Sequence, residues 1–173
     1  MNPEYSIWLL PEEQEERQLC TTIAMLAGRL GGEAFMPHVT LQGDLARPCA
    51  ALAEAVDELA KDIPCLRWPV QAVACGDHFF RCLYLRFAAD THFAALQDRT
   101  RALTGTADGL SPFPHLSLAY GEANAKTMAE RDALSGAFQD REIVLNRIAL
   151  VRSSKDVPIA EWRILAQHAL SGR

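Results

Sequence analysis

The sequence Pro37-His38-Val39-Thr40-Leu41 returns 77 residues later (115 − 38) as Pro114-His115-Leu116-Ser117-Leu118. Nine prolines and five histidines in 173 residues give about 0.26 Pro-His pairs by chance (9 × 5 / 173), whereas these two copies are present. In both copies the pair is followed by an aliphatic residue, a hydroxyl residue and a leucine. This agreement indicates that the two halves of the chain arose by duplication.

Each copy is predicted to form a β-strand that presents an imidazole and a hydroxyl on one face. Side chains of a strand alternate between its two faces. His38, Thr40 and Gln42 are therefore expected to share a face, as are His115 and Ser117. The valine and leucines between them would then point into a core.

Composition favours a single soluble domain with a small ligand. Of the residues, 49% are hydrophobic and 23% are charged, which is ordinary for a globular protein. The net charge of −5 argues against a broad surface for long nucleic acid, because such surfaces neutralise phosphates. The five cysteines form no Cys-x-x-Cys pair, and neither a signal peptide nor a membrane span is evident, so a cytoplasmic protein with reduced thiols is expected.

Hydrophobic periodicity predicts the same order of elements in both halves of the chain. Strands are expected over 5–10, 38–43, 66–75, 79–87, 115–120, 141–152 and 162–170, and helices over 12–30, 48–62, 89–107 and 125–139. Asp90 and Asn124 are the expected N-caps of the third and fourth helices. Met128 and Leu134 are expected on the apolar face of the fourth helix.

The repeated order predicts one α+β domain over 1–173, built from two β-α-β-α-β units. The units, 1–76 and 77–153, would form two lobes related by a pseudo-twofold axis, and 154–173 would add a final strand. Antiparallel sheets would line a central cleft and helices would cover them outside. The two motif strands would then face each other across this cleft.

A histidine on each wall of a cleft suits paired general acid and general base catalysis near neutral pH. A phosphodiester needs such a pair, since one imidazole deprotonates water while the other protonates the departing oxygen. Thr40 and Ser117 would hydrogen-bond the non-bridging oxygens as charge builds there. His38 and His115 thus need neither a metal nor a cofactor. The residue pattern leaves open two core histidines or a zinc site, although no third ligand stands at ligand spacing.

These motifs resemble the paired His-x-[Ser/Thr]-x signatures of the two-histidine phosphoesterase superfamily, and more closely its cyclic phosphodiesterase branch. The resemblance extends to four further stretches: 5–11 with its Trp8, 79–85 with Phe-Phe-x-Cys, 114–120 with its tyrosine, and 145–147. It implies hydrolysis of ADP-ribose 1″,2″-cyclic phosphate or of nucleoside 2′,3′-cyclic phosphates, the latter to 2′-phosphates.

The resemblance also suggests roles for individual residues. It makes His38 the acid and His115 the base, and it names Tyr120 as a substrate-binding residue. Trp8 and Phe80 either stack on a substrate base or pack in the core. Tyr120 lies five residues after His115, so strict alternation points it away from the cleft unless the strand bulges.

Two other functions fit the same motifs. One is an RNA-end 2′,3′-cyclic phosphodiesterase or 2′-5′ RNA ligase-like activity, and the other is an inactive nucleotide-binding or RNA-binding module. Arg81 and Arg147 are candidates for contact with a second phosphate. The remaining histidines, at 78, 92 and 168, are expected to be ordinary surface or partly buried residues.

Overall fold

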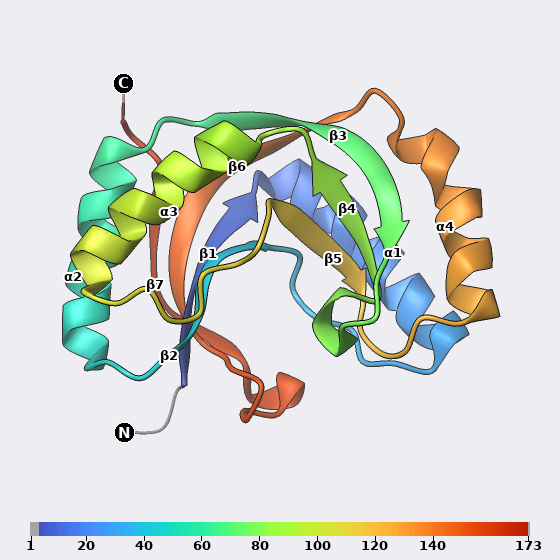
Figure 1. Ribbon diagram of the computed structural model, residues 1–173, viewed down its shortest axis with the longest axis horizontal. Helices are drawn as coiled ribbons and strands as arrows, with labels where there is room; N and C mark the ends of the chain where they lie inside the picture. Colours follow the sequence, from blue (N-terminus) through green and yellow to red (C-terminus); the bar gives the residue numbers. More distant parts are fainter. Residues whose placement is uncertain (1–3, 173) are drawn as a thin grey trace.

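The computed structural model describes residues 4–172 (Figure 1). Its strands are β1 (Tyr5–Pro11), β2 (Val39–Leu45), β3 (Leu66–Cys75), β4 (Leu83–Phe87), β5 (His115–Ala119), β6 (Glu142–Arg152) and β7 (Arg163–Ala169). Its α-helices are α1 (Glu13–Leu30), α2 (Cys49–Asp62), α3 (Asp90–Thr104) and α4 (Ala125–Phe138). Two short 3₁₀ helices, η1 (Phe79–Arg81) and η2 (Ile159–Glu161), precede β4 and β7.

All strand pairs are antiparallel, and the sheet runs in the order β2-β1-β6-β3-β4-β5, with β7 added to β6. Exchanging β1 with β4, β2 with β5 and β3 with β6 gives the same order in reverse. The α+β fold with a pseudo-twofold arrangement is thereby confirmed.

Each lobe takes its third strand from the other half of the sequence. β6 pairs with β1, and the C-terminal part of β3 pairs with β4. The two lobes are joined where the first residues of β3 pair with the start of β6, from Leu66 opposite Leu145 to Pro69 opposite Glu142. The lobes therefore interlock and do not coincide with residues 1–76 and 77–153.

The helices cover the sheet in two pairs, each with one helix from either half (Figure 1). α2 contacts α3 at one end of the molecule, and α1 contacts α4 at the other. In α1 the expected face is buried through Leu19, Ile23 and Leu26, and Gly31 ends the helix with a left-handed φ of 76°. None of the helices within residues 4–172 is both long and apolar enough to cross a membrane.

Three local expectations were wrong. The segment expected as a strand over 79–87 begins with η1, and only Leu83–Phe87 is extended. Asp90 is the first residue of α3 and pairs with Arg86, while Ala89 stands at the N-cap. On α4, Met128 is 46% exposed.

The packing and capping of α4 explain that last difference. Thr127 and Phe138 are its buried residues, so a polar side chain takes the inward position next to Met128. The Asn124 cap is confirmed, because its side chain accepts from the backbone N–H groups of Lys126 and Thr127. Thr127 in turn donates from its hydroxyl to the carbonyl of Glu122, which holds it inward.

Candidate active site

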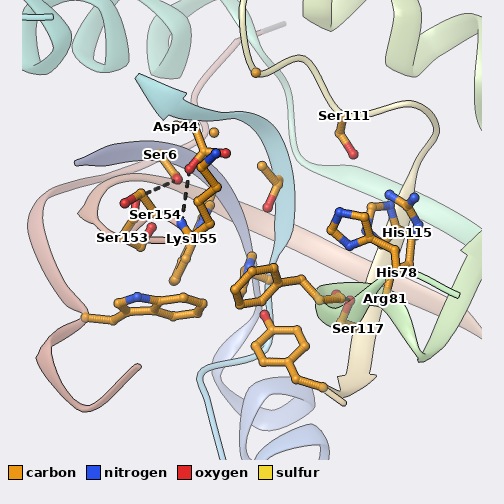
Figure 2. A pocket seen from close by; sticks show the side chains of 18 of the residues that line it. Ser6, Asp44, His78, Arg81, Ser111, His115, Ser117, Ser153, Ser154 and Lys155 are labelled. Carbon is orange, nitrogen blue, oxygen red and sulfur yellow. Dashed lines mark hydrogen bonds between the residues drawn. The ribbon is translucent and has the colours of Figure 1, made fainter. Parts of the chain in front are cut away.

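The four predicted catalytic side chains line one cleft between the lobes. His38, which directly precedes β2, and Thr40 come from one motif, while His115 and Ser117 come from β5. The cavity has a volume of about 190 Å³. A cleft of this size suits a small ligand. Figure 2 shows this cavity with His115 and Ser117 on one side.

Both imidazoles are oriented by a contact with the backbone carbonyl oxygen two residues earlier in the chain. Nδ1 of His38 lies 2.6 Å from the carbonyl oxygen of Met36, and Nδ1 of His115 lies 2.9 Å from that of Phe113. A carbonyl oxygen only accepts hydrogen bonds, so it selects the tautomer with the proton on Nδ1. Nε2 of each ring is then the nitrogen available to a bound molecule.

Burial favours the neutral form of both imidazoles. It lowers the pKa of His38 from 6.5 to about 3, against the opposing effect of the Met36 carbonyl. It lowers the pKa of His115 to about 4, and the guanidinium groups of Arg81 and Arg86 add to that effect. A bound anion between the rings would favour the protonated form of either.

The two rings differ in their neighbours. Trp8 stacks on His38 with ring centroids 3.5 Å apart and planes 7° apart, so the indole face covers that imidazole. His115 instead lies beside the ring of Phe113, over which the guanidinium groups of Arg81 and Arg86 are placed. An indole face attracts a cation, whereas guanidinium groups repel one. This difference breaks the symmetry of the two motifs.

The two hydroxyls are also in different states. Ser117 donates a hydrogen bond to the carbonyl oxygen of Phe80 at 2.7 Å. Thr40 lines the opposite wall of the cavity, where it faces Trp8 across the β1–β2 pair. Ser117 must therefore reorient before it can donate to a bound phosphate.

The substrate-binding candidates Trp8, Phe80 and Tyr120 all line the cavity. The position of Tyr120 is explained by an irregularity in the β4–β5 pair, where Tyr84 faces Ser117 but Leu83 faces Ala119. One extra residue on β5 reverses the alternation beyond it. Tyr120 packs with its ring centroid 3.6 Å from that of Phe35, and burial raises the pKa of its phenol.

The expectation for Gln42 was wrong, and a bulge is again the reason. Trp8 faces Thr40 while Ile7 faces Gln42, so β2 has an extra residue at Leu41 and Gln42 turns away from the cavity. Its amide donates to the carbonyl oxygens of Thr106 and Asp108 and accepts from the hydroxyl of Thr104. Gln42 thus ties β2 to the loop that precedes β5.

A backbone contact reinforces that tie. The N–H of Gly43 donates to the carbonyl oxygen of Gly109 at 2.7 Å. A Cβ atom on residue 109 would lie 1.7 Å from the carbonyl oxygen of Gly43, so only glycine permits this approach. This backbone contact holds β2 directly against the loop that precedes β5.

Of the two arginines considered for a second phosphate, only Arg81 lines the cavity. Arg147 pairs with Glu16 and donates to the carbonyl of Pro11, where β1 ends and α1 begins. Several residues that line the cavity were missed by sequence reasoning: Ser6, Asp44, His78, Ser153, Ser154, Lys155 and Trp162. Only Ser6 carried a usable signal, because it shares a strand face with Trp8.

The chemistry of these groups is that of proton transfer and hydrogen bonding. Among residues 4–172, no three His, Cys, Asp or Glu side chains are grouped so that they could hold a metal ion. His92 accepts from the indole N–H of Trp68, and His168 lies 3.8 Å from a carboxylate oxygen of Asp57, both away from the cleft. The two motifs together offer the cleft two imidazoles and two hydroxyls, and the guanidinium group of Arg81 lines the same cavity.

Comparison with known proteins gives the chain its family. The cyclic phosphodiesterase-like protein family matches residues 3–170. A cyclic phosphodiesterase of Arabidopsis thaliana is 24% identical over 167 residues, covering 94% of this chain and 92% of the relative.

Solved structures agree on the fold. LigT of E. coli in complex with 3′-AMP has a TM-score of 0.61 at 14% identity and covers 98% of both chains. TT0787 of Thermus thermophilus has a TM-score of 0.60 at 17% identity and covers 99% of both. The chain therefore belongs to the cyclic phosphodiesterase-like family, a family of enzymes within the two-histidine phosphoesterase superfamily.

Proposed function

We propose that this enzyme hydrolyses small cyclic phosphodiesters without a metal ion. The substrates are ADP-ribose 1″,2″-cyclic phosphate, nucleoside 2′,3′-cyclic phosphates, or both, and the latter are opened to 2′-phosphates. The observation that carries the proposal is the pair of imidazoles on one cavity, each with Nδ1 fixed by a carbonyl oxygen and Nε2 left available.

The reaction needs one neutral and one protonated imidazole. His115 accepts a proton from water at Nε2, and the water oxygen attacks phosphorus. The bond between phosphorus and the leaving oxygen breaks. The leaving oxygen is O3′ when the product is a 2′-phosphate. His38 gives the proton on Nε2 to that oxygen, so protons and charge balance.

The surroundings of the two rings support this assignment of roles. A substrate phosphate between the rings stabilises a protonated imidazole on either side. The indole face of Trp8 adds to that stabilisation at His38. Arg81 and Arg86 oppose it at His115. Burial lowers the pKa of His38 further, to about 3 against about 4 for His115, so a protonated His38 depends on the substrate phosphate and the indole face.

The hydroxyls of Thr40 and Ser117 complete the site by donating to the non-bridging oxygens, where negative charge grows in the transition state. A small substrate is supported by the size of the cavity and by the net charge of −5. Solved LigT structures include complexes with small ligands, 3′-AMP and NADP⁺ among them. An RNA-end substrate remains the alternative for the same chemistry.

The proposal is tested by turnover of three substrates: adenosine 2′,3′-cyclic phosphate, ADP-ribose 1″,2″-cyclic phosphate and an oligonucleotide with a cyclic end. We expect the two small substrates to be opened much faster than the oligonucleotide. His38→Ala and His115→Ala should each lower turnover by about 10²- to 10⁴-fold, the usual value of a positioned proton-transfer group. His168→Ala, outside the cleft, is the control and should keep the wild-type rate.

The roles are separated by a diester with a 4-nitrophenolate leaving group, which departs without protonation. His38→Ala should recover much of its rate on this substrate, while His115→Ala stays slow. Equal recovery of both variants would mean that the roles are wrongly assigned. Full activity of both variants on the natural cyclic phosphates would overturn the two-histidine mechanism itself.

A further inference from the structure

The cavity has a second polar end, away from His115, that the proposed chemistry does not use. It is formed by Ser6 on β1, Asp44 on β2, and Ser153, Ser154 and Lys155, which follow β6 (Figure 2). These five residues are called the distal subsite. They come together because β1 pairs with both β2 and β6, so the ends of all three strands meet there.

Hydrogen bonds within the distal subsite fix its donors and acceptors. Ser6 donates its hydroxyl to the carbonyl oxygen of Ser153 at 3.0 Å, so its oxygen is left to accept. Ser154 accepts from the N–H of Asp156 at 3.2 Å, so its hydroxyl is left to donate. One carboxylate oxygen of Asp44 accepts from the N–H of Lys155 at 3.1 Å, and the other has no such bond among the described residues.

Ser153 gives an independent sign that a ligand belongs here. Its side chain lines the cavity and the residue is only 2% exposed, yet its hydroxyl has no hydrogen-bond partner among residues 4–172. A buried hydroxyl without a partner is costly, and native proteins seldom keep one without a reason. A turn of the Ser153 side chain toward the cavity would let a ligand accept its hydrogen bond and would remove this cost.

The charge of the distal subsite points to an uncharged ligand group. Asp44 and Lys155 contribute one charge of each sign, whereas Arg81 makes the end near His115 positive. Because these two charges cancel, the distal subsite offers a second phosphate no net attraction. Donors and acceptors side by side, without net charge, instead match the hydrogen-bonding edge of a nucleobase.

Reach and packing also fit a nucleobase. Thr40 lies opposite Trp8 and Leu45 lies opposite Tyr5, three residues away along β1, so the two ends of the cavity are about 10 Å apart at ~3.3 Å per residue, which is the scale of a mononucleotide. The ring of Trp162, 6.2 Å from that of Phe80, lies on the cavity wall and offers an aromatic surface to the face of a base.

We propose that the distal subsite binds the base of a nucleoside 2′,3′-cyclic phosphate and that it prefers guanine; this rests on the function proposed above. Guanine presents two adjacent donors, N1–H and N2–H₂, which a carboxylate such as that of Asp44 accepts together. Its O6 and N7 acceptors suit the ammonium group of Lys155. Adenine, cytosine and uracil lack two adjacent N–H donors of this kind.

The test compares binding and turnover in wild type and Asp44→Asn. Asparagine tolerates the left-handed φ of 49° at this position, and its amide oxygen still accepts from the N–H of Lys155. The variant therefore keeps the local fold but replaces one acceptor by a donor. Glu54→Gln, an exposed carboxylate on α2 that lies outside the cavity, is the matched control.

Calorimetric binding of the products guanosine 2′-phosphate and uridine 2′-phosphate tests the subsite without any turnover. Wild type and Glu54→Gln should bind the guanosine product more tightly, and Asp44→Asn should reduce that preference by about 10- to 100-fold, the range for a hydrogen bond to a charged group. Equal binding of the two products by wild type, or an unchanged preference in Asp44→Asn, would overturn the inference.

Turnover separates this inference from the proposed function. Glycerol 1,2-cyclic phosphate carries the reacting ring without a base, so its opening reports on the two histidines alone. If wild type opens it and all four nucleoside 2′,3′-cyclic phosphates with the same kcat/KM, the distal subsite is refuted while the function stands. If nothing is opened but the guanosine product still binds preferentially, the function is refuted and the subsite stands.

Discussion

The buried imidazoles make the stability of this protein sensitive to acid in a range where carboxylates contribute little. Both folded-state pKa values, about 3 for His38 and about 4 for His115, lie below the ordinary value of 6.5. The unfolded chain therefore binds more protons than the folded protein as the pH falls below 6.5. Stability is lost over that range, and the loss continues down to the folded pKa values.

The magnitude at pH 5 follows from these pKa values. At pH 5 the pH is about 1.5 units below the pKa of the unfolded imidazoles, so these are protonated, while both folded imidazoles remain mainly neutral. At 1.36 kcal/mol per unit, each histidine therefore lowers the free energy of unfolding by about 2 kcal/mol. Together His38 and His115 should lower the free energy of unfolding by about 4 kcal/mol between pH 7.5 and pH 5. That is a large part of the 5–15 kcal/mol typical of a domain.

The assay is urea unfolding followed by tryptophan fluorescence at the two pH values. His38→Asn and His115→Asn replace each ring by an amide whose N–H group can still donate to the carbonyl that holds Nδ1. Each variant should lose about half of the acid sensitivity, and the double variant nearly all of it. His168→Asn on the exposed strand β7 is the control. Unchanged acid sensitivity in the double variant would refute the reasoning.

Three further predictions follow from the same contacts. Thr40→Val and Ser117→Ala should lower kcat by about 10- to 100-fold, less than either histidine variant, since proton transfer survives; a loss equal to that of His115→Ala would contradict this. Gln42→Leu leaves the carbonyls of Thr106 and Asp108 without their donor, so urea unfolding should show a loss of about 3 kcal/mol, against little change for the exposed Gln71→Leu. Dialysis against EDTA should leave turnover of adenosine 2′,3′-cyclic phosphate unchanged, and recovery of a lost rate by zinc or manganese would count against the metal-free reaction.

The sequence predicted the parts of the site that depend on local geometry. Alternation along a strand is a property of a few consecutive residues, so the cavity positions of His38 with Thr40, and of His115 with Ser117, follow from the motifs alone. The same rule failed two residues further, at Gln42, because a bulge depends on the pairing of β2 with β1. Strict alternation would have pointed Tyr120 away from the cavity. It reaches the cavity because the β4–β5 pair has a similar irregularity.

The distal subsite shows why the rest was not predictable. Ser153, Ser154 and Lys155 are close to Asp44 only because β6 from the second half pairs with β1 from the first. That exchange of strands between lobes is set by pairing across the whole chain, and no residue within 153–155 signals it. Periodicity gave the order of the elements, whereas the partner of each strand had to come from the structure.

The Pro-His unit explains how a duplicated motif can keep its chemistry in two different environments. Proline restricts the residue before it to extended backbone and itself offers no N–H group. In both copies the carbonyl two residues before the histidine is left to hold Nδ1, at 2.6 Å for His38 and 2.9 Å for His115. Orientation and tautomer are thus set within three residues, independently of the lobe.

The environment can then diverge without disturbing that geometry. An indole face covers His38, and two guanidinium groups lie near His115. The proposed division of acid and base roles between the two imidazoles requires such a difference in environment. Because the orienting contacts are local and the charged neighbours are not, substitution of Trp8 or Arg81 should shift the balance of protonation while leaving both Nδ1 contacts in place.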